Sequence, residues 1–280
     1  MILRAQQGET AVMEIGGRQF HTAGHTYVMG ILNVTPDSFS DGGQWTALDQ
    51  ALRRVDKMQE EGVDVVDIGG ESTRPGSVMI SDEEEIERIV PMLRAVKARF
   101  DLPVSLDTYK GAVAKAGIAE GADLINDIWG LKHDDKIASV ISKSGLPCCL
   151  MHNRKNAVYQ NFMRDVTTDL SASLALAEKA GIERDRIILD PGIGFAKSYE
   201  ENLEAIDRLE DLKELGCPLL LGCSRKSVIG LTLDLPVDQR LEGTLATTVM
   251  AVMKGCMFVR VHDVRENVRV IKMTEAILRR

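Results

Sequence analysis

The sequence has little of several features that would assign it to particular classes of protein. Only 4% of its 280 residues are aromatic, and no apolar run approaches the roughly 18 residues of a membrane span. Its five cysteines form no Cys-x-x-Cys pair, and such an odd, scattered set fits reduced thiols. The first ten residues lack the apolar stretch of a signal peptide. We therefore expect a cytoplasmic protein without a membrane partner.

The sequence also lacks the short motifs of several enzyme classes. There is no His-Glu-x-x-His or paired Cys/His spacing for zinc, and no Gly-x-Ser-x-Gly of a serine hydrolase. Residues 222–227 contain the Lys-Ser of a phosphate-binding loop but not its first glycine spacing. A net charge of −8 argues against nucleic acid as a partner. An anionic substrate would therefore be held by local Arg and Lys residues.

Short apolar segments alternate with longer amphipathic segments along most of the chain. Strands are predicted at 27–32, 63–68, 103–107, 123–126, 147–151, 186–190, 218–222 and 257–261. Helices are predicted at 46–61, 81–98, 110–120, 134–144, 165–180, 198–214, 238–254 and 263–278. Because most strands are apolar throughout, they resemble the strands of a parallel sheet that is covered on both faces.

Eight strand–helix units in a chain of this length predict an α/β fold, a (β/α)8 TIM barrel. A doubly wound open sheet is the alternative, but the Gly-x-Gly-x-x-Gly expected after its first strand is absent. Gly16-Gly17 predicts a small β-hairpin over residues 12–20. We expect residues 1–26 to form an N-terminal extension with this hairpin, and residues 27–280 to form a single barrel domain.

Local patterns predict two further details of the helices. Ser81 with Glu84, and Asp263 with Glu266, have the spacing of capping boxes at helix starts. The helix at 238–254 carries an apolar stripe, for which a buried core face is the first interpretation and a subunit interface the alternative. This stripe consists of Leu245, Ala246, Val249, Met250 and Met253.

Two polar loops follow predicted strands early in the chain. In residues 30–43, GILNVTPDSFSDGG, a short apolar run opens into a segment rich in hydroxyl and carboxylate groups. Residues 67–76, DIGGESTRPG, repeat this design. Enzymes place chemistry that must open and close on such loops. The two loops therefore predict a site built from strand ends.

Nearly all the other predicted strands also end in polar residues. In a barrel the catalytic face is the carboxyl end of the strands, although strands can end in polar groups without any function. Asp190 precedes Pro-Gly-Ile-Gly, which lets the backbone approach a ligand closely. The polar groups at the strand ends are Asn33, Asp67, Asp107, Asn126, His152 with Asn153, Asp190, residues 224–227, and Arg260 with His262.

These residue types indicate a ligand with two chemically distinct ends. The two acids Asp107 and Asp190, with the amide of Asn126, suit a planar heterocycle that is rich in N–H donors. Arg260 and His262 suit phosphate oxygens, and Asn33 suits either these or Mg²⁺. A helical turn beginning at Ser227 would offer N–H groups to a carboxylate. His152 is interpreted as a hydrogen-bonded structural histidine rather than a base.

Together, the motifs resemble those of the dihydropteroate synthase family, in the family's order. They are GILNVTPDSFSDGG (30–43), DIGGESTRPG (67–76), SLDTYK (105–110), LINDIWG (124–130), LDPGIGF (189–195), GCSRKS (222–227) and RVHDV (260–264). The resemblance implies a (β/α)8 barrel that joins a dihydropterin-methyl diphosphate to the amine of 4-aminobenzoate. The products would be diphosphate and dihydropteroate, a folate precursor.

The resemblance also implies roles for individual residues. The pterin ring would be held by Asp107, Asn126, Asp190 and Lys226. The diphosphate would be held by Arg260, His262, Asn33 and Thr73, with Mg²⁺ at Asn33. The aminobenzoate would be held by Phe39, Asp41, Arg74, Pro75, Phe195 and Ser227. Catalytic roles would belong to Asp41, Lys226, Arg260 and His262. Members of the family are usually homodimers. Residues 151–155 depart from the family's pattern, so no catalytic role is assigned to His152 or Arg154.

These implied roles lead to a mechanistic hypothesis of dissociative substitution. Diphosphate departs first, helped by Mg²⁺, Arg260 and His262, and leaves a short-lived cation on the pterin. Because the attacking aryl amine is neutral at pH 7, no strong general base is required. Two alternatives share a pterin pocket: a folate-dependent methyltransferase barrel and a non-catalytic pterin-binding barrel. Only the synthase would release diphosphate.

Overall fold

The computed structural model describes residues 12–34, 44–72 and 78–279, and within these ranges eight parallel strands form a closed barrel. The order of neighbours is β8-β7-β6-β5-β4-β3-β10-β9. An isolated bridge between Leu189 and Leu219 joins the two ends of this sheet, and the N–H of Leu189 donates to the carbonyl of Pro218 at 2.9 Å. The predicted barrel is therefore confirmed, and the open sheet was the wrong alternative.

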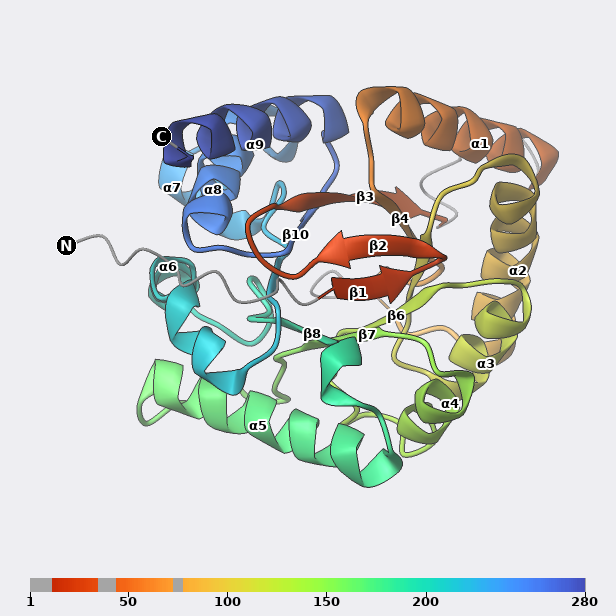
Figure 1. The fold of residues 1–280 in the computed structure, drawn as a ribbon, viewed down its shortest axis with the longest axis horizontal. Helices are drawn as coiled ribbons and strands as arrows, with labels where there is room; N and C mark the ends of the chain where they lie inside the picture. Colours follow the sequence, from red (N-terminus) through yellow and green to blue (C-terminus); the bar gives the residue numbers. More distant parts are fainter. Residues whose placement is uncertain (1–11, 35–43, 73–77, 280) are drawn as a thin grey trace.

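Helices surround the strands in a ring (Figure 1). The described strands are β1 (Val12–Ile15), β2 (Arg18–His21), β3 (Tyr27–Asn33), β4 (Val65–Gly69), β5 (Val104–Asp107), β6 (Leu124–Asp127), β7 (Cys148–Met151), β8 (Ile187–Asp190), β9 (Leu220–Leu221) and β10 (Phe258–Val261). The described α-helices are α1 (Gln44–Glu61), α2 (Asp82–Arg99), α3 (Gly111–Ala119), α4 (Ile137–Ser144), α5 (Phe162–Ala180), α6 (Tyr199–Asp207), α7 (Ser227–Leu233), α8 (Leu241–Met253) and α9 (Val264–Leu278). None of the helices in the described ranges has the length and hydropathy of a membrane span.

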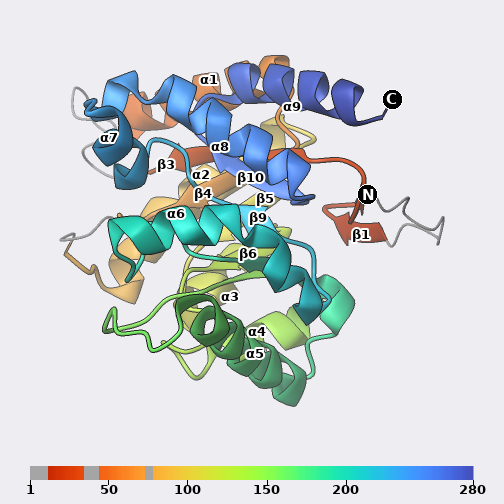
Figure 2. The same cartoon turned by 90° about the vertical axis from the view of Figure 1, so that its left-hand side faces the viewer.

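The antiparallel hairpin β1–β2 covers the amino-terminal mouth of the barrel. Figures 1 and 2 show it lying across the centre of the ring at one end of the molecule, while α7 lies at the other end. Its apolar side chains Met13, Ile15 and Phe20 are buried and pack in one cluster with inward-facing barrel residues such as Leu124 and Phe258. Because this mouth is filled by the hairpin, a ligand of the barrel is expected at the opposite mouth.

Strand register determines which side chains point into the barrel. Successive side chains of a strand point to opposite faces of the sheet, and two residues paired in register point to the same face. One inward-facing residue therefore identifies the inward-facing residues of the neighbouring strands. The interior layer next to the amino-terminal mouth is apolar and includes Val65, Cys149 and Ile188. The layers towards the carboxyl ends are largely polar, and their inward positions are Asn33, Asp67, Ser105, Asp107, Asn126, Asp190 and Arg260. The fold therefore gathers the polar strand ends at one mouth.

Two local predictions differ from the structure, and a third is confirmed. The helix expected over 198–214 ends at Asp207 and continues as a 3-10 helix, Leu209–Leu215. Asp263 precedes α9 but does not cap it, because its carboxylate accepts hydrogen bonds from Arg225 at 3.0 and 2.5 Å. The capping interaction of Ser81 with the N–H of Glu84 is present at 3.1 Å. The spacing of Asp263 and Glu266 thus gave a wrong prediction of a helix cap, because Arg225, which is distant in the sequence, binds the Asp263 carboxylate.

The buried face of α8 also differs from the first interpretation. Thr244, Thr248, Ala251 and Val252 are its buried residues. In the predicted stripe, Ala246 and Met253 are exposed, Met253 at 59%, and the other three members are half-buried. The interpretation of this stripe as a core face was therefore wrong, and the alternative of a subunit interface remains.

Candidate active site

Arg260, on β10, joins two acidic strands at the carboxyl mouth of the barrel. Its Nε atom lies 2.6 Å from Asp67 Oδ2, and its Nη2 atom lies 2.6 Å from Asp107 Oδ2. One guanidinium therefore serves two buried carboxylates, which leaves an excess of negative charge. Burial raises the pKa of Asp107, and the charge of Arg260 opposes this rise. Among the described residues, Arg260 Nη1 has no hydrogen-bond acceptor and remains available to a ligand.

Several acceptors in this layer have no donor within the described part of the chain. Asp67 Oδ1, Ser105 Oγ and Asp107 Oδ1 are buried without a hydrogen-bond partner there. Asp190 Oδ1 accepts the N–H of Gly192 at 2.7 Å, whereas none of the described donors reaches Oδ2. Buried acceptors without donors are costly, so a cluster of them indicates a ligand that brings N–H groups.

Asp190 and Lys226 lie in the same part of the site as Arg260. A Cβ atom placed on Gly222 would lie 3.4 Å from Asp190 Oδ2 and 3.9 Å from Arg260 Cβ, so both side chains border Gly222. Burial lowers the pKa of Lys226, and the nearby Asp190 carboxylate opposes this effect. Burial also raises the pKa of Asp190, opposed chiefly by Lys226. The structure thus brings Asp107, Asp190, Lys226 and Arg260 together.

Lys226 also contacts the loop that follows β8. Its ammonium donates to the carbonyl of Ile193 and lies 4.6 Å from the centroid of the Phe195 ring. Ser227 is the first residue of α7 and is exposed. The predicted helical start at Ser227 is therefore present, beside the ring expected to contact the aminobenzoate.

The remaining described site residues lie at neighbouring strand ends. Asn126 is buried and in register with Asp107, and Asn33 is half-buried at the end of β3. His262 follows β10, and its Nδ1 lies 3.0 Å from Ser224 Oγ, which also accepts the His262 N–H at 3.2 Å. Five predicted site residues lie outside the described ranges: Phe39, Asp41, Thr73, Arg74 and Pro75.

Asp67 and Ser224 were expected at strand ends, but no role was predicted for them. Asp67 lies inside the apolar segment Val65–Gly69 at an inward position, and its side chain is fully buried. A carboxylate in a buried strand needs a cationic partner, and this signal could have marked Asp67 as a site residue, although it does not say which cation is the partner. Ser224 orients the His262 ring, but only the fold shows that these two side chains meet.

His152 is completely buried at the end of β7. Its Nε2 lies 3.0 Å from Asp169 Oδ2, and its Nδ1 lies 2.8 Å from Lys197 Nζ. Burial lowers the pKa of His152 to about 4, against the effect of the Asp169 hydrogen bond. The ring is therefore neutral at pH 7, and the interpretation of a hydrogen-bonded structural histidine is confirmed.

We expect the His152 ring to remain neutral in the folded protein down to about pH 5. An unfolded histidine gains its proton near pH 6.5, so falling pH favours the unfolded chain between the two pKa values. This effect lowers the free energy of unfolding by up to about 3 kcal/mol between pH 6.5 and 4. NMR titration of the ring C–H resonance, with the urea-unfolded chain as control, measures the shift. Titration of the folded ring near pH 6.5 would contradict it.

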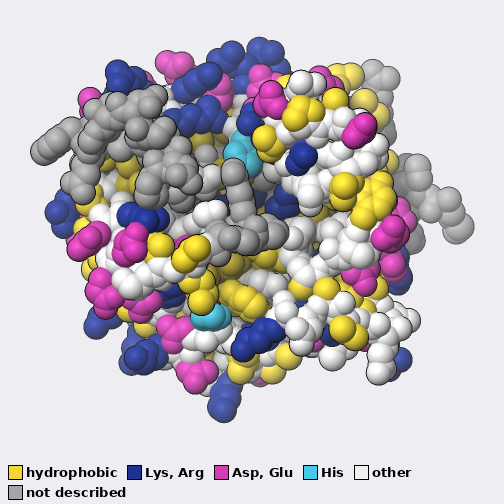
Figure 3. All heavy atoms as spheres, turned by 180° about the vertical axis from the view of Figure 1, so that it is seen from behind, with side chains coloured by type: hydrophobic (Ala, Val, Ile, Leu, Met, Phe, Trp, Pro, Cys, Tyr) yellow, Lys and Arg dark blue, Asp and Glu magenta, His cyan; other side chains and the backbone are white. Residues whose placement is uncertain are grey.

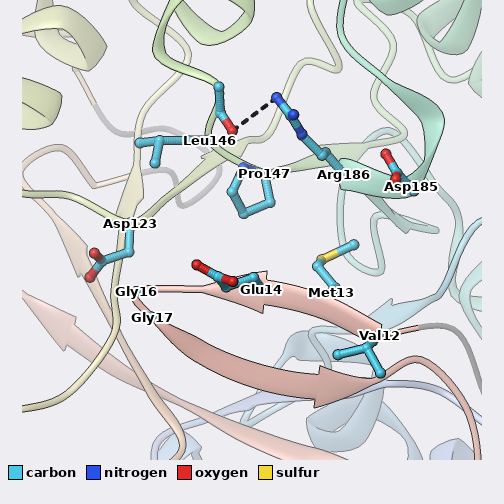
Figure 4. A pocket seen from close by; sticks show the side chains of 11 residues that line it. Val12, Met13, Glu14, Gly16, Gly17, Asp123, Leu146, Pro147, Asp185 and Arg186 are labelled. Carbon is cyan, nitrogen blue, oxygen red and sulfur yellow. Dashed lines mark hydrogen bonds between the residues drawn. The ribbon is translucent and has the colours of Figure 1, made fainter.

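The two mouths of the barrel differ in what they offer a ligand. A cavity of about 570 Å³ lies beside the hairpin at the amino mouth, where Arg186 already donates to the carbonyl of Gly145 (Figure 4). None of the predicted site residues within the described ranges lines that cavity. On the opposite face, Lys, Arg and His side chains lie around the centre (Figure 3). The convergent charges therefore place the candidate site at the carboxyl mouth.

Comparisons with known proteins agree with this geometry. The family model described as pterin binding enzyme matches residues 29–262. A dihydropteroate synthase of Clostridium beijerinckii is 57% identical over 269 residues, which is 96% of this chain and 100% of that protein. A dihydropteroate synthase structure from Clostridium difficile, determined in the presence of pteroic acid, has a TM-score of 0.90 and 46% identity, and covers 92% of this chain and 99% of its own. A structure of the Xanthomonas albilineans enzyme with 4-aminobenzoic acid has a TM-score of 0.91 and 38% identity, with coverages of 96% and 98%.

A closed (β/α)8 barrel with paired acids and cations at its carboxyl mouth, matched by this family model, defines a pterin-binding barrel enzyme. The matches to dihydropteroate synthases cover nearly all of this chain at high sequence identity. The chain therefore belongs to the dihydropteroate synthase family.

Proposed function

We infer that the chain joins (7,8-dihydropterin-6-yl)methyl diphosphate to 4-aminobenzoate, forming 7,8-dihydropteroate and releasing diphosphate in folate biosynthesis. It is a transferase of small-molecule substrates. The observation that carries this conclusion is the layer of carboxylate oxygens beside Arg260 and Lys226 that have no donor among the described residues. Relatives have been solved with pteroic acid and with 4-aminobenzoic acid, which are the corresponding product type and second substrate.

The pterin ring is assigned to Asp107, Asn126, Asp190 and Lys226. A pterin presents a row of N–H donors, which the free oxygens of Asp107 and Asp190 can accept. Each acceptor left unmatched by a wrong ligand would stay buried and unpaired, so the site should discriminate strongly. This assignment explains why the fold keeps acidic groups in its interior.

The diphosphate is assigned to Arg260, His262 and Asn33, with Thr73 from the loop after β4. Two nitrogens of the Arg260 guanidinium are already bound by carboxylates, and Nη1 has no acceptor within the part of the chain that the structure describes. Ser224 holds the His262 ring in one orientation. Developing negative charge on the leaving group therefore meets donors that need no rearrangement.

Mg²⁺ is the metal we propose, at Asn33. No three His, Cys, Asp or Glu side chains in the described ranges are placed to hold a metal ion together. A single amide oxygen at the rim of the mouth suits Mg²⁺, which commonly takes one or two protein oxygens and fills its shell with phosphate and water. When bound, the ion would neutralise charge on the diphosphate.

The aminobenzoate is assigned to Phe195 and Ser227, together with Phe39, Arg74 and Pro75. Phe195 presents a ring beside the Lys226 ammonium, and Ser227, the next residue after Lys226, is the first residue of α7. Asp41 is proposed to act in catalysis from the loop after β3. His152, the buried neutral histidine, is held by Asp169 and Lys197, and this agrees with a reaction that needs no strong base.

The proposed function is tested by supplying the pterin diphosphate, Mg²⁺ and 4-aminobenzoate, and measuring diphosphate and dihydropteroate together. We expect equal amounts of both products, with no dihydropteroate when the amine is omitted. A non-catalytic barrel would bind the pterin diphosphate and release nothing. A methyltransferase would require a folate methyl donor and would also release no diphosphate.

We also propose a cytoplasmic location and a single barrel domain over residues 27–280. All five cysteines are free and buried, which suits a reducing compartment. One core cluster, which contains outward-facing strand residues and the helix residues packed on them, extends from Val28 to Ile271.

A homodimer is proposed to form through α8. Its outer face carries Leu245, Val249 and Met253, which are half-buried or exposed, while its threonines face inwards. We expect Met253→Glu to place a charge in the interface and convert the dimer to a monomer, as measured by light scattering at micromolar concentration. Leu176→Glu, on α5 and 38% exposed, is the matched control and should remain dimeric. A dimeric Met253→Glu protein would contradict this interface.

A further inference from the structure

The loop between β8 and α6 has an unusual backbone. Within five residues, Gly192, Gly194 and Ala196 have φ values of +71°, +82° and +44°. Alanine rarely adopts this left-handed region, and a Cβ atom on Gly192 would lie 2.0 Å from the carbonyl oxygen of His152. Such a conformation persists only where surrounding contacts hold it.

Side chains bind most of the carbonyl groups of this loop. Between Gly192 and Ala196, four of the five carbonyls accept a side-chain hydrogen bond. Lys226 binds Ile193 from the side of the site, and Tyr159 binds Ala196 at 2.7 Å. The other two carbonyls, of Gly192 and Phe195, are both bound by Lys197. Lys197 therefore makes more of these bonds than any other described residue.

The ammonium group of Lys197 has an acceptor for each of its protons. Nζ lies 2.9 Å from the carbonyl oxygen of Gly192, 3.1 Å from that of Phe195 and 2.8 Å from His152 Nδ1. An ammonium has three donors and no acceptor, so this arrangement is saturated. It also requires His152 to accept at Nδ1 and to donate from Nε2 to Asp169, as a neutral ring does.

The support of Lys197 reaches a helix of the outer ring. Asp169, on α5, accepts from His152 and also from Arg154 Nε at 2.5 Å. The Arg154 guanidinium lies 4.3 Å from the centroid of the Tyr159 ring. Lys197 is thus fixed by the end of β7 and by α5, which are both independent of the loop that it holds.

Asp190 does not depend on Lys197 in the same way. It is the last residue of β8, in register with Met151 on β7, and its carbonyl accepts the His152 N–H at 2.9 Å. Phe195 lies five residues further along, beyond two of the left-handed residues. Loss of Lys197 should therefore displace Phe195 while Asp190 stays with its strand.

We propose that Lys197 is a positioning residue that places Phe195 for the aminobenzoate without touching either substrate. The inference rests on the proposed function, because it uses the assignment of Phe195 to the second substrate. Lys226 cannot replace Lys197 in this task, since its ammonium also faces Asp190 and the pterin side of the site. Lys197 instead approaches the loop from the side of His152.

The first test compares Lys197→Met with Lys155→Met in the full-length protein. Lys155 is an exposed lysine in the neighbouring loop and is the matched control. We expect Lys197→Met to raise the KM for 4-aminobenzoate about tenfold or more, with the Kd for the hydroxymethyl dihydropterin changed less than about threefold. A purely structural role would lower thermal stability without this difference between the two substrates. An unchanged KM for 4-aminobenzoate would overturn the proposal.

The second test uses pH with the Lys197→Arg variant. Burial lowers the pKa of Lys197 to about 7, with Asp190 and Glu201 opposing this effect and Lys226 and Arg154 adding to it. His152 and Asp169 complete the titratable groups around it. Above pH 7 the wild-type amine loses a donor, so the KM for 4-aminobenzoate should rise towards pH 9.

Arginine keeps its charge throughout this range, so the rise should be absent in Lys197→Arg, and this variant should recover part of the affinity that Lys197→Met loses. The same rise in both proteins would overturn the proposal. A wild-type protein that forms no dihydropteroate would instead refute the proposed function, and the two failures are therefore distinguishable.

Discussion

Replacing Asp190 by asparagine is expected to weaken binding of the dihydropterin by about 100- to 1,000-fold. Asp190 is a buried residue, and none of the described donors reaches its Oδ2 atom, which lies on the side of the Lys226 ammonium. Asparagine can still accept the Gly192 N–H through its oxygen, so the turn after β8 should persist. Its NH₂ group, however, would face the N–H donors of the ring, and Lys226 would lose its nearest buried anion.

Calorimetry with the hydroxymethyl dihydropterin, which lacks the diphosphate, measures this loss directly. Asp207→Asn is the matched control, because it makes the same change at an exposed position near the end of α6. It should bind as the wild type does. An Asp190→Asn protein that is folded and binds within about threefold of the wild type would remove Asp190 from the pterin site.

Replacing Arg260 by lysine is expected to slow release of diphosphate in a single turnover by about 100-fold or more. Lysine keeps the positive charge but lacks the planar fork that joins Asp67 to Asp107 and leaves Nη1 free. Alanine is a poorer test, because two buried carboxylates without a cation would cost about 3–5 kcal/mol of stability. The KM for 4-aminobenzoate should change little, because Arg260 is assigned to the leaving group.

Rapid-quench measurement of diphosphate separates this effect from product release. Arg186→Lys, at the amino mouth, makes the same substitution far from the site and should release diphosphate at the wild-type rate. If Arg260→Lys also matched the wild-type rate, Arg260 would not stabilise the leaving group, and its role would be confined to pairing the two carboxylates.

The barrel and much of its site could be predicted from local patterns. Short apolar runs identified the strands, because a strand covered on both faces has little room for polar residues. Asp107, Asn126 and Asp190 could be placed at the mouth because each lies at or near the end of such a run. Each also lies two positions after an inward-facing residue of its strand, so its own side chain points inwards. Gly16-Gly17 predicted the hairpin, where both residues have positive φ.

The remaining features depend on contacts between residues far apart in the chain. Arg260 meets Asp67 across 193 residues and Asp107 across 153, and no local pattern encodes these pairs. Asp263 has a capping spacing, yet it binds Arg225 instead. The stripe on α8 was assigned to the core because apolar residues usually face inwards. Thr244 and Thr248 are buried instead, and Thr248 donates to Asn267 at 2.6 Å.

The central claim is that acids from β5 and β8 and cations beside β9 and β10 bind one ligand at the carboxyl mouth. A crystal structure of this protein with a non-reactive analogue of the pterin diphosphate tests it most directly. We predict a ring bonded to Asp107 and Asp190, with its phosphates against Arg260 and His262. An analogue found at the amino mouth beside the hairpin, or a ring that contacts neither carboxylate, would contradict the account.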